Sequence, residues 1–355
     1  MRIVDHIKFL LNIIVFFLSF AIFCVVATFI MRPLGYDSDN ISGFYGEEPY
    51  SLDVVYIGGS ACFTYWMPIE GYKNAGITSY NYAANTAPPE VYRYWAMEIK
   101  KTQNPKLLIF DARAFQWRKK YPTSRNMEVA YRVATTYMRY GSERATIIND
   151  LIPNYLSSGQ DLASYHFDLA KYHSRRDGVN IREALQKMFG TYKNTSRGFL
   201  FVDEIEPIQK TADSSIAETA QIDTEESLKQ LLEYLNDNNQ KALFIISPYA
   251  ETIDEKQEIN TIEKIVTAAG FDFLDTNDYV EKIGIDYEKD FYNSQHTNPS
   301  GAMKYSAFLS EYLKTHYDFA DKRGKNEIWD SSIQPWNDML NNHLQILEEK
   351  HNATI

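Results

Sequence analysis

The amino-acid sequence predicts an α/β protein with a parallel sheet that follows an apolar N-terminal helix. Short apolar runs alternate with segments of helical periodicity, and one long apolar segment lies near the N-terminus. Strands that alternate with helices imply parallel pairing, with helices on both faces of the sheet. We therefore expect three layers, α/β/α. The chain of 355 residues is long enough for one large domain or two small ones.

The composition is that of a globular protein without a basic surface. Hydrophobic residues make up 45% of the chain and charged residues 23%, which is normal for a protein with a packed core. The formal net charge of −11 argues against a nucleic-acid partner, because nucleic-acid-binding surfaces are basic. Cys24 lies in the apolar N-terminal segment and Cys62 beyond it, so no disulfide framework is expected.

Residues 9–31 are predicted to be a transmembrane anchor. This segment is apolar except for Asn12, Ser19 and Thr28. About 20 residues suffice to cross a bilayer, whereas the apolar core of a signal peptide is usually about 7–15 residues long. A cleaved export signal is the alternative interpretation.

The charges on either side of this anchor predict its orientation. Arg2 and Lys8 precede it, and acidic residues follow within the next stretch of chain: Asp37, Asp39, Glu47 and Glu48. By the positive-inside rule, residues 1–8 are cytoplasmic and the chain beyond the anchor is extracellular. We expect a single-pass protein of the cell membrane.

The first half of the predicted domain follows a short linker. Residues 33–51 are rich in Gly, Asp, Ser and Tyr and are interpreted as a stalk, so that the domain covers residues 52–320. Pro88-Pro89 starts a helix that ends near Lys101, since proline suits the first turn of a helix. Apolar runs predict buried strands at Asp53–Ile57, Ile77–Tyr82 and Lys106–Phe110.

A helical insertion, at about residues 117–225, interrupts the alternation. Its helical patches are Glu128–Arg139, Arg144–Leu156 and Ile181–Phe189, and the polar segment Thr211–Thr224 is expected to be loose.

The alternation of helix and strand then resumes and completes the domain. Helices are expected at Glu225–Asn236, Lys256–Ala269 and Pro299–His316, and strands at Ala242–Ser247 and Phe271–Leu274. Residues 321–355 are interpreted as a C-terminal helical extension, with a helix at Trp336–Lys350.

A serine and a histidine are the candidate catalytic residues. Gly58-Gly59-Ser60 follows the first strand directly, and His296 follows the last one. Functional sites of such sheets lie at the carboxyl ends of the strands, so both residues should meet at one edge. Histidine is the side chain suited to take a serine proton near neutral pH. Gly59 would let the Ser60 N–H face a developing oxyanion, although an ordinary turn has the same sequence.

Four segments resemble the sequence blocks of the SGNH hydrolases: Asp53–Ala61, Gly76–Asn85, Pro105–Asp111 and Asp290–Asn298 with Gly301-Ala302. More closely, residues 50–116 and 240–345 resemble the membrane-anchored SGNH-like proteins of bacterial cell-surface acylation. Those proteins are relatives of the lipoteichoic acid D-alanyl transfer protein and of polysaccharide O-acetyltransferases.

This resemblance implies a fold, an activity and a partner. The fold would be the SGNH (flavodoxin-like) three-layer α/β/α fold, with Ser60 as nucleophile and His296 as general base. The protein would be an exoplasmic acyltransferase or esterase acting on ester-linked acyl groups of a cell-envelope glycan or teichoic-acid-like polymer. A membrane-bound O-acyltransferase would be its partner, and no metal or cofactor is expected. The alternative is an inactive scaffold that binds the polymer or that partner.

One departure from the family concerns the third catalytic residue. The family has an aspartate three residues before the histidine, and this chain has Asn293. An amide oxygen can orient the imidazole but carries no charge to stabilise its protonated form. Asp290 is a second candidate for this role, and a Ser–His dyad or an inactive relic are the remaining alternatives.

The remaining site candidates would bind the oxyanion or the substrate. The family places a Gly and an Asn in the loop after the second strand, where this chain offers Asn81 and Asn85. Asn85 could instead simply hold that loop. Arg113, just beyond the third strand, is the other candidate.

Two further patterns leave alternatives open. Arg125, Arg132 and Arg139 recur every seven residues and would lie along one helix face. They form either a solvated face, which we favour, or a site for an anionic polymer or lipid headgroups. Three aromatic residues after the serine form either a stacking surface for sugar rings or the buried side of the first helix: Phe63, Tyr65 and Trp66.

Overall fold

The centre of the protein is a parallel five-stranded sheet. The computed structural model describes residues 3–120, 124–156, 161–175, 178–209 and 216–354. The strand order is β2-β1-β3-β4-β5, and every neighbouring pair is parallel, which is a doubly wound order. The strands are β1 (Val54–Gly58), β2 (Ser79–Ala83), β3 (Leu107–Asp111), β4 (Ala242–Ile246) and β5 (Asp272–Asp275). The predicted parallel sheet is confirmed.

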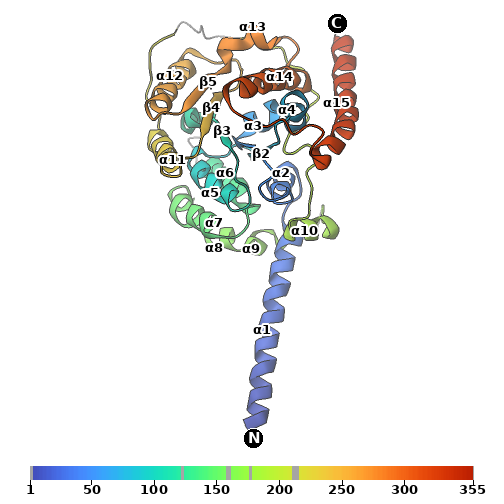
Figure 1. Ribbon diagram of the computed structural model, residues 1–355. Coiled ribbons are helices and arrows are strands. Elements are labelled where there is room, and N and C mark those ends of the chain that lie inside the picture. Colours follow the sequence, from blue (N-terminus) through green and yellow to red (C-terminus); the bar gives the residue numbers. More distant parts are fainter. Residues whose placement is uncertain (1–2, 121–123, 157–160, 176–177, 210–215, 355) are drawn as a thin grey trace.

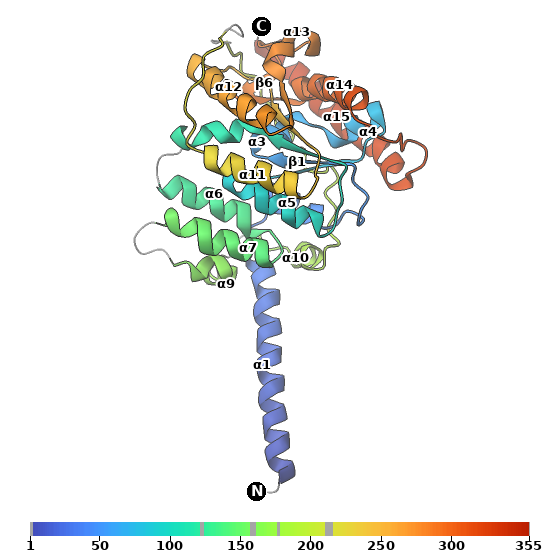
Figure 2. The ribbon, with the colours of Figure 1, turned by 60° about the vertical axis from the view of Figure 1, so that its left-hand side comes forward.

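Helices cover both faces of this sheet. Val55 and Ile57 of β1 belong to one hydrophobic cluster, and Val54 and Tyr56 belong to the other. Because both faces are buried, the strands are continuously apolar instead of alternating. The cluster with Val55 and Ile57 also contains residues of α5 (Tyr92–Lys100), α11 (Glu225–Asp237) and α12 (Ile253–Ala268). The cluster on the other face contains residues of α3 (Ser60–Tyr65), α13 (Val280–Ile283) and α14 (Pro299–His316). The three predicted layers are therefore present (Figure 2).

The N-terminal helix α1 (Ile3–Met31) projects away from this domain (Figure 1). Its candidate membrane-spanning part, Asp5–Met31, is 27 residues long, and no residue of its most apolar stretch is buried by the rest of the protein. By length and composition, this helix is able to cross a bilayer.

The segment interpreted as a stalk is instead part of the domain, so that prediction is wrong. Residues 33–51 contain the helix α2 (Tyr36–Phe44), which packs against β2. Ile41 and Phe44 are fully buried, and the Tyr80 hydroxyl donates to the Asn40 carbonyl at 2.7 Å. Ile41 and Phe44 are its buried large apolar side chains, and the other buried residues of the helix are Ser38, Asn40, Ser42 and Gly43. This largely polar composition gave no sign of a buried helix.

The insertion adds a layer between the sheet and α1 (Figure 2). The predicted helical patches correspond to α6 (Ser124–Thr136), α7 (Ser142–Thr146) with the turns that follow it, and α10 (Ile181–Met188). Two short helices, α8 (Ala163–His166) and α9 (Asp168–Tyr172), were not predicted, because one turn is too short to show a period. Residues 211–215 of the predicted loose segment lie outside the described residues.

The predicted solvated face of arginines is contradicted at Arg132. Arg132 is buried, donates to the Ser164 carbonyl and covers the ring of Tyr165 at 3.4 Å from its centroid. Arg139 is exposed, with its guanidinium over the ring of Tyr45. Arg132 is therefore a packing residue, whereas Arg139 remains in contact with solvent. The side chain of Arg125 lies outside the described part of the chain.

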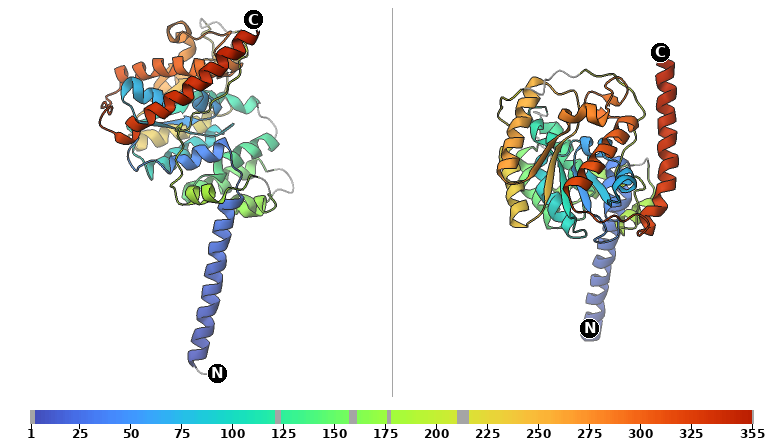
Figure 3. Two further views of the ribbon diagram at one scale, coloured as in Figure 1. Left: turned by 90° about the vertical axis from the view of Figure 1, so that its right-hand side faces the viewer. Right: turned by 45° about the horizontal axis from the view of Figure 1, so that its top comes forward.

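The C-terminal helix is longer than predicted and belongs to the domain. It is α15 (Glu327–Thr354), which runs along the outside of the molecule (Figure 3). It contacts α4 (Pro68–Ala75), and three hydrogen bonds join the two helices. The Lys73 ammonium donates to Asn337 at 2.7 Å. The Trp336 indole donates to Glu70 at 2.8 Å, and the Tyr72 hydroxyl donates to Asp330 at 2.7 Å.

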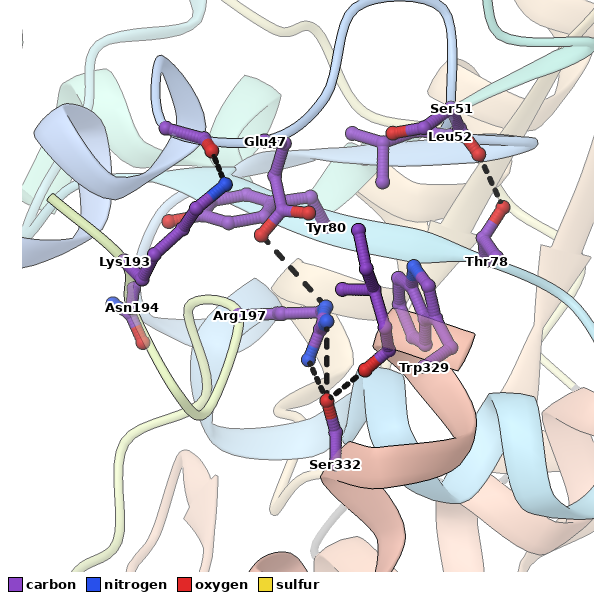
Figure 4. A network of polar contacts seen from close by, with 12 residues as sticks. Glu47, Ser51, Leu52, Thr78, Tyr80, Lys193, Asn194, Arg197, Trp329 and Ser332 are labelled. Atoms are coloured by element: carbon purple, nitrogen blue, oxygen red, sulfur yellow. Dashed lines mark hydrogen bonds and ion pairs between the residues drawn. The ribbon is translucent and has the colours of Figure 1, made fainter. Parts of the chain in front are cut away.

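A buried arginine joins the two ends of the domain (Figure 4). The guanidinium of Arg197 lies 3.9 Å from the ring centroid of Trp329 in α15 and 3.7 Å from the carboxylate of Glu47. Its terminal nitrogens also reach the Ser332 hydroxyl. Segments near residues 47, 197 and 330 are thereby held together, so neither flank behaves as an appendage.

Candidate active site

Ser60 lies where β1 passes into α3, at the edge expected from the sequence. It is the first residue of α3 and only 8% exposed. The turn before it requires two segments of the backbone to lie very close together. A Cβ atom on Gly58 would lie 2.7 Å from the Cβ of Asp111 and 2.8 Å from the Cβ of Cys62. Only glycine fits there, so the turn that precedes Ser60 packs directly against the end of β3.

Replacing Gly58 by alanine is therefore expected to destabilise the domain by about 1–3 kcal/mol, the usual cost of overpacking a core. Gly59 provides a matched control, because a Cβ atom there would make only ordinary contacts at 3.8 and 3.9 Å. Urea unfolding of both variants measures the difference. Equal stability of Gly58→Ala and wild type would contradict the close packing described for this turn.

His296 reaches Ser60 from a small hairpin. The strands β6 (Phe291–Asn293) and β7 (His296–Thr297) are antiparallel, and Asn293 pairs with His296. The Nε2 atom of His296 lies 2.7 Å from Ser60 Oγ. The Thr297 hydroxyl donates to the Thr64 carbonyl of α3 at 2.8 Å. This bond ties the histidine hairpin to the serine helix, so the two catalytic candidates are held on connected elements.

Asn293 fixes the protonation pattern of the imidazole. Its Oδ1 atom lies 2.9 Å from the Gln295 backbone N–H and 2.9 Å from Nδ1 of His296. A backbone N–H can only donate, so the atom that it contacts is the amide oxygen, which can only accept. Nδ1 must then carry the proton of the neutral ring, and Nε2 presents its lone pair to the Ser60 hydroxyl. This is the tautomer that a general base requires.

Arg113 and Tyr65 hold the tip of the hairpin. Nη1 of Arg113 donates to the Gln295 carbonyl at 2.9 Å. The Tyr65 hydroxyl lies between the carbonyls of Pro248 and Gln295 and is shared by them. Arg113 is fully buried, and its guanidinium lies 4.1 Å from the ring centroid of Tyr249. Arg113 thus supports the histidine loop, and its contact with substrate stays a prediction. Tyr65 is fully buried, as are its neighbours Phe63 and Trp66, so the stacking surface for sugars is absent from these three residues.

The other predicted site residues have structural contacts. Asp290 accepts hydrogen bonds from Lys304 at 2.6 Å and from the Asp286 N–H at 2.7 Å, which engages it away from the histidine. The Asn81 amide is buried in β2 and donates to the Trp66 carbonyl at 2.8 Å.

Asn85 also departs from its expected role. Its backbone N–H donates to Asp37 at 2.8 Å, and its exposed side-chain amide lies against the same carboxylate. The alternative in which Asn85 holds a loop is the one seen. The Ser60 N–H, at the start of α3, remains the candidate oxyanion donor, since the first N–H groups of a helix have no partner within it.

The site keeps the imidazole neutral. Burial is the main cause that lowers the pKa of His296 to about 3, and the positive charge of Arg113 acts in the same direction. A half-buried ring without a carboxylate partner resists protonation. The lone pair on Nε2 is therefore available at neutral pH, but an imidazolium at this position would be poorly stabilised.

Several residues around the site were not predicted. Tyr292 stacks on the His296 ring, with 5.4 Å between ring centroids and 10° between planes. Asp111 is buried behind the Gly58 turn, and burial raises the pKa of its carboxyl group. The hydrogen bond between Thr64 and Thr297 joins residues far apart in the chain, and no sequence pattern predicts such a contact.

No protein-family model matches the chain, and no curated protein matches it. The chemistry of the site is therefore the main guide to function. A nearly buried serine hydroxyl bonded to the unprotonated nitrogen of a neutral imidazole can lose its proton as it attacks an electrophile.

Proposed function

We propose that this protein is a membrane-anchored serine acyltransferase or esterase of the SGNH type. The observation that carries this proposal is the hydrogen-bonded series Ser60–His296–Asn293, with the imidazole in the tautomer of a general base. The strand order and the position of Ser60 after β1 support the same fold family. The length of α1 and the flanking charges support anchoring by residues 9–31 and an extracellular domain.

The reaction proceeds through an acyl-serine. Ser60 Oγ attacks the carbonyl carbon of an acyl ester or thioester while its proton passes to Nε2 of His296. The tetrahedral intermediate collapses, the bond to the leaving alkoxide or thiolate breaks, and His296 returns the proton to that group. A polymer hydroxyl or water then loses its proton to Nε2 and attacks the acyl-serine, which releases the product and restores Ser60.

The substrate class follows from the resemblance and from the anchor. We infer that the acceptor or donor is an ester-bearing cell-envelope glycan or a teichoic-acid-like polymer. A membrane-bound O-acyltransferase would deliver the acyl group to the same face of the membrane. The anchor supports this arrangement because it restricts the domain to the membrane surface.

A second candidate is an inactive scaffold that binds the polymer or the membrane partner. Two observations favour it: Asn293 is uncharged, and Arg113 opposes protonation of His296. Both raise the free energy of the imidazolium that catalysis requires.

Acyl transfer from a small activated ester separates these two functions. The full-length protein in detergent is incubated with p-nitrophenyl acetate, and its peptides are analysed by mass spectrometry. We expect an acetyl group on Ser60 that glycerol removes faster than water does, and no acetyl group there in Ser60→Ala. An unmodified Ser60, under conditions that acetylate a control esterase, would favour the scaffold.

A further inference from the structure

Helix α10 buries a lysine and exposes apolar side chains, which is the reverse of an ordinary surface helix. Its inward side holds Ala184 and Lys187, which are buried. The Lys187 ammonium is satisfied there by Ser38 at 2.9 Å, Asp39 at 2.5 Å and Glu183 at 2.6 Å. A surface helix normally buries its apolar residues and exposes its lysines, so this arrangement leaves the apolar residues of α10 to another environment.

Those apolar residues point outward. Ile181 is 57% exposed, and Phe189, just after the helix, is 67% exposed. Leu185, only partly buried, lies one turn from each of them, so the three form a single stripe. Val179, before the helix, is 42% exposed. Single apolar residues scattered over a surface are normal, but these side chains form one continuous stripe.

This stripe lies beside the point where α1 enters the domain. Both α9 and α10 contact α1, and α10 runs crosswise to α1 at that level (Figures 1 and 2). Arg175 donates to the carbonyls of Ile30 and Met31 at the end of α1. The end of the candidate membrane span is therefore fixed against the insertion, and α10 is fixed at the same height.

Further exposed side chains at α9 and α10 are of the kinds that bind a membrane surface. Phe167, directly before α9, is 45% exposed. Lys171 in α9 and Arg182 in α10 are exposed cations. Aromatic and apolar side chains with cations between them are the composition of a helix that lies at a membrane interface. Cations near the bilayer surface are attracted to anionic lipid headgroups.

We propose that α10 lies in the headgroup region of the bilayer that α1 spans, with Ile181, Leu185 and Phe189 facing the lipid. This inference rests on the membrane anchor of the proposed function. The helix α1 and the interfacial helix α10 then contact the membrane in two directions. The domain is thereby held at one height and one tilt, which places Ser60 at a fixed distance from the bilayer.

A tryptophan at position 189 tests this placement. The full-length Phe189→Trp variant is reconstituted into vesicles of phosphatidylcholine and phosphatidylglycerol, with or without bromine on the acyl chains near the headgroups. Ile253→Trp is the matched control, because Ile253 is 54% exposed and α12 lies on the side of the domain away from α1 (Figure 1). The wild-type protein gives the background from its five tryptophans.

We expect the brominated lipid to quench at least about half of the emission added by the indole at position 189, since interfacial helices bury their apolar face about 5–10 Å into the bilayer boundary. The emission added at position 253 should be unchanged. Absence of quenching in Phe189→Trp, in vesicles that carry the protein on flotation, would overturn the interfacial placement. Shielding of the introduced indole from aqueous acrylamide without quenching by lipid would also overturn it, in favour of a protein partner.

Failure of the anchor itself has a different signature. If the protein does not float with the vesicles, both the anchor and the placement of α10 are wrong. Acetylation of Ser60 in detergent is measured independently and does not depend on either result.

Discussion

Replacing Asn293 by aspartate is expected to increase the rate at which Ser60 reacts with a fluorophosphonate by about 10- to 100-fold at pH 8. The carboxylate can accept the same two hydrogen bonds, from Gln295 N–H and His296 Nδ1. A charged acceptor makes a hydrogen bond roughly twice as strong as a neutral one, and each 1.4 kcal/mol of added transition-state stabilisation is tenfold in rate. In a serine protease, replacing the triad aspartate by asparagine imposes the wrong tautomer and lowers the rate about 10⁴-fold. The gain expected here is smaller, because Asn293 already holds the right tautomer.

The same substitution is expected to change the pH profile. In the wild type the pKa of His296 is lowered to about 3, so the imidazole stays neutral and the labelling rate should be flat from about pH 8 to 5. In Asn293→Asp the carboxylate raises that pKa, and the rate should fall as the pH falls through the raised value.

Asn293→Ala is the opposing control. It removes the acceptor for Nδ1–H, so the tautomer is no longer fixed and labelling should become slower than in the wild type. Unchanged rates in both variants would contradict a role for Asn293 in orienting the base. A wild-type profile that falls by half near pH 6.5 would contradict the neutral, half-buried imidazole.

Replacing Asp168 by alanine is expected to destabilise the protein by about 3–5 kcal/mol, the cost of leaving a buried charge unpaired. One oxygen of Asp168 accepts from Nε and Nη2 of Arg32 at 2.9 and 2.7 Å, and from Nη2 of Arg144 at 2.9 Å. The side chains of Asp168 and Arg144 are 2% and 1% exposed, and that of Arg32 is 11% exposed. The substitution would leave two guanidinium groups without their common partner, at the junction of α1 and the insertion.

Thermal unfolding of the full-length protein in detergent measures this effect. The exposed pair of Glu204 and Lys350 provides the control, because surface ion pairs contribute about 0–1 kcal/mol. We expect a large decrease in Tm for Asp168→Ala and almost none for Glu204→Ala. Similar values for the two variants would contradict the stabilising role of the buried ion pairs.

The sheet was predictable because each strand is a local pattern. A buried parallel strand is a short apolar run, and each predicted strand overlaps an observed one. The helix Pro299–His316 begins and ends as predicted, because Asn298 and Pro299 mark its start by their capping chemistry. The meeting of Ser60 and His296 followed from the rule that the carboxyl ends of parallel strands share one edge.

The remaining features depend on contacts that no local pattern encodes. The helix α2 is recognisable only when β2 is present to cover it, and α8 and α9 are too short to show a period. Arg113 lies at the expected edge of the sheet, but its contact with a backbone carbonyl in a distant loop was not predicted. Asp290 and Asn85 were predicted as site residues from their position in the sequence. In the structure Asp290 binds Lys304, and Asn85 binds Asp37.

Fluorophosphonate labelling of the full-length protein tests the central claim most directly. The reagent reacts with activated serines, and mass spectrometry locates the adduct in wild type, Ser60→Ala and His296→Ala. We expect an adduct on Ser60 in the wild type only, because Ser60 Oγ needs the lone pair of His296 at 2.7 Å to act as a nucleophile. A wild-type Ser60 that stays unmodified while a control esterase is labelled, or an adduct that persists in His296→Ala, would contradict a working serine–histidine pair.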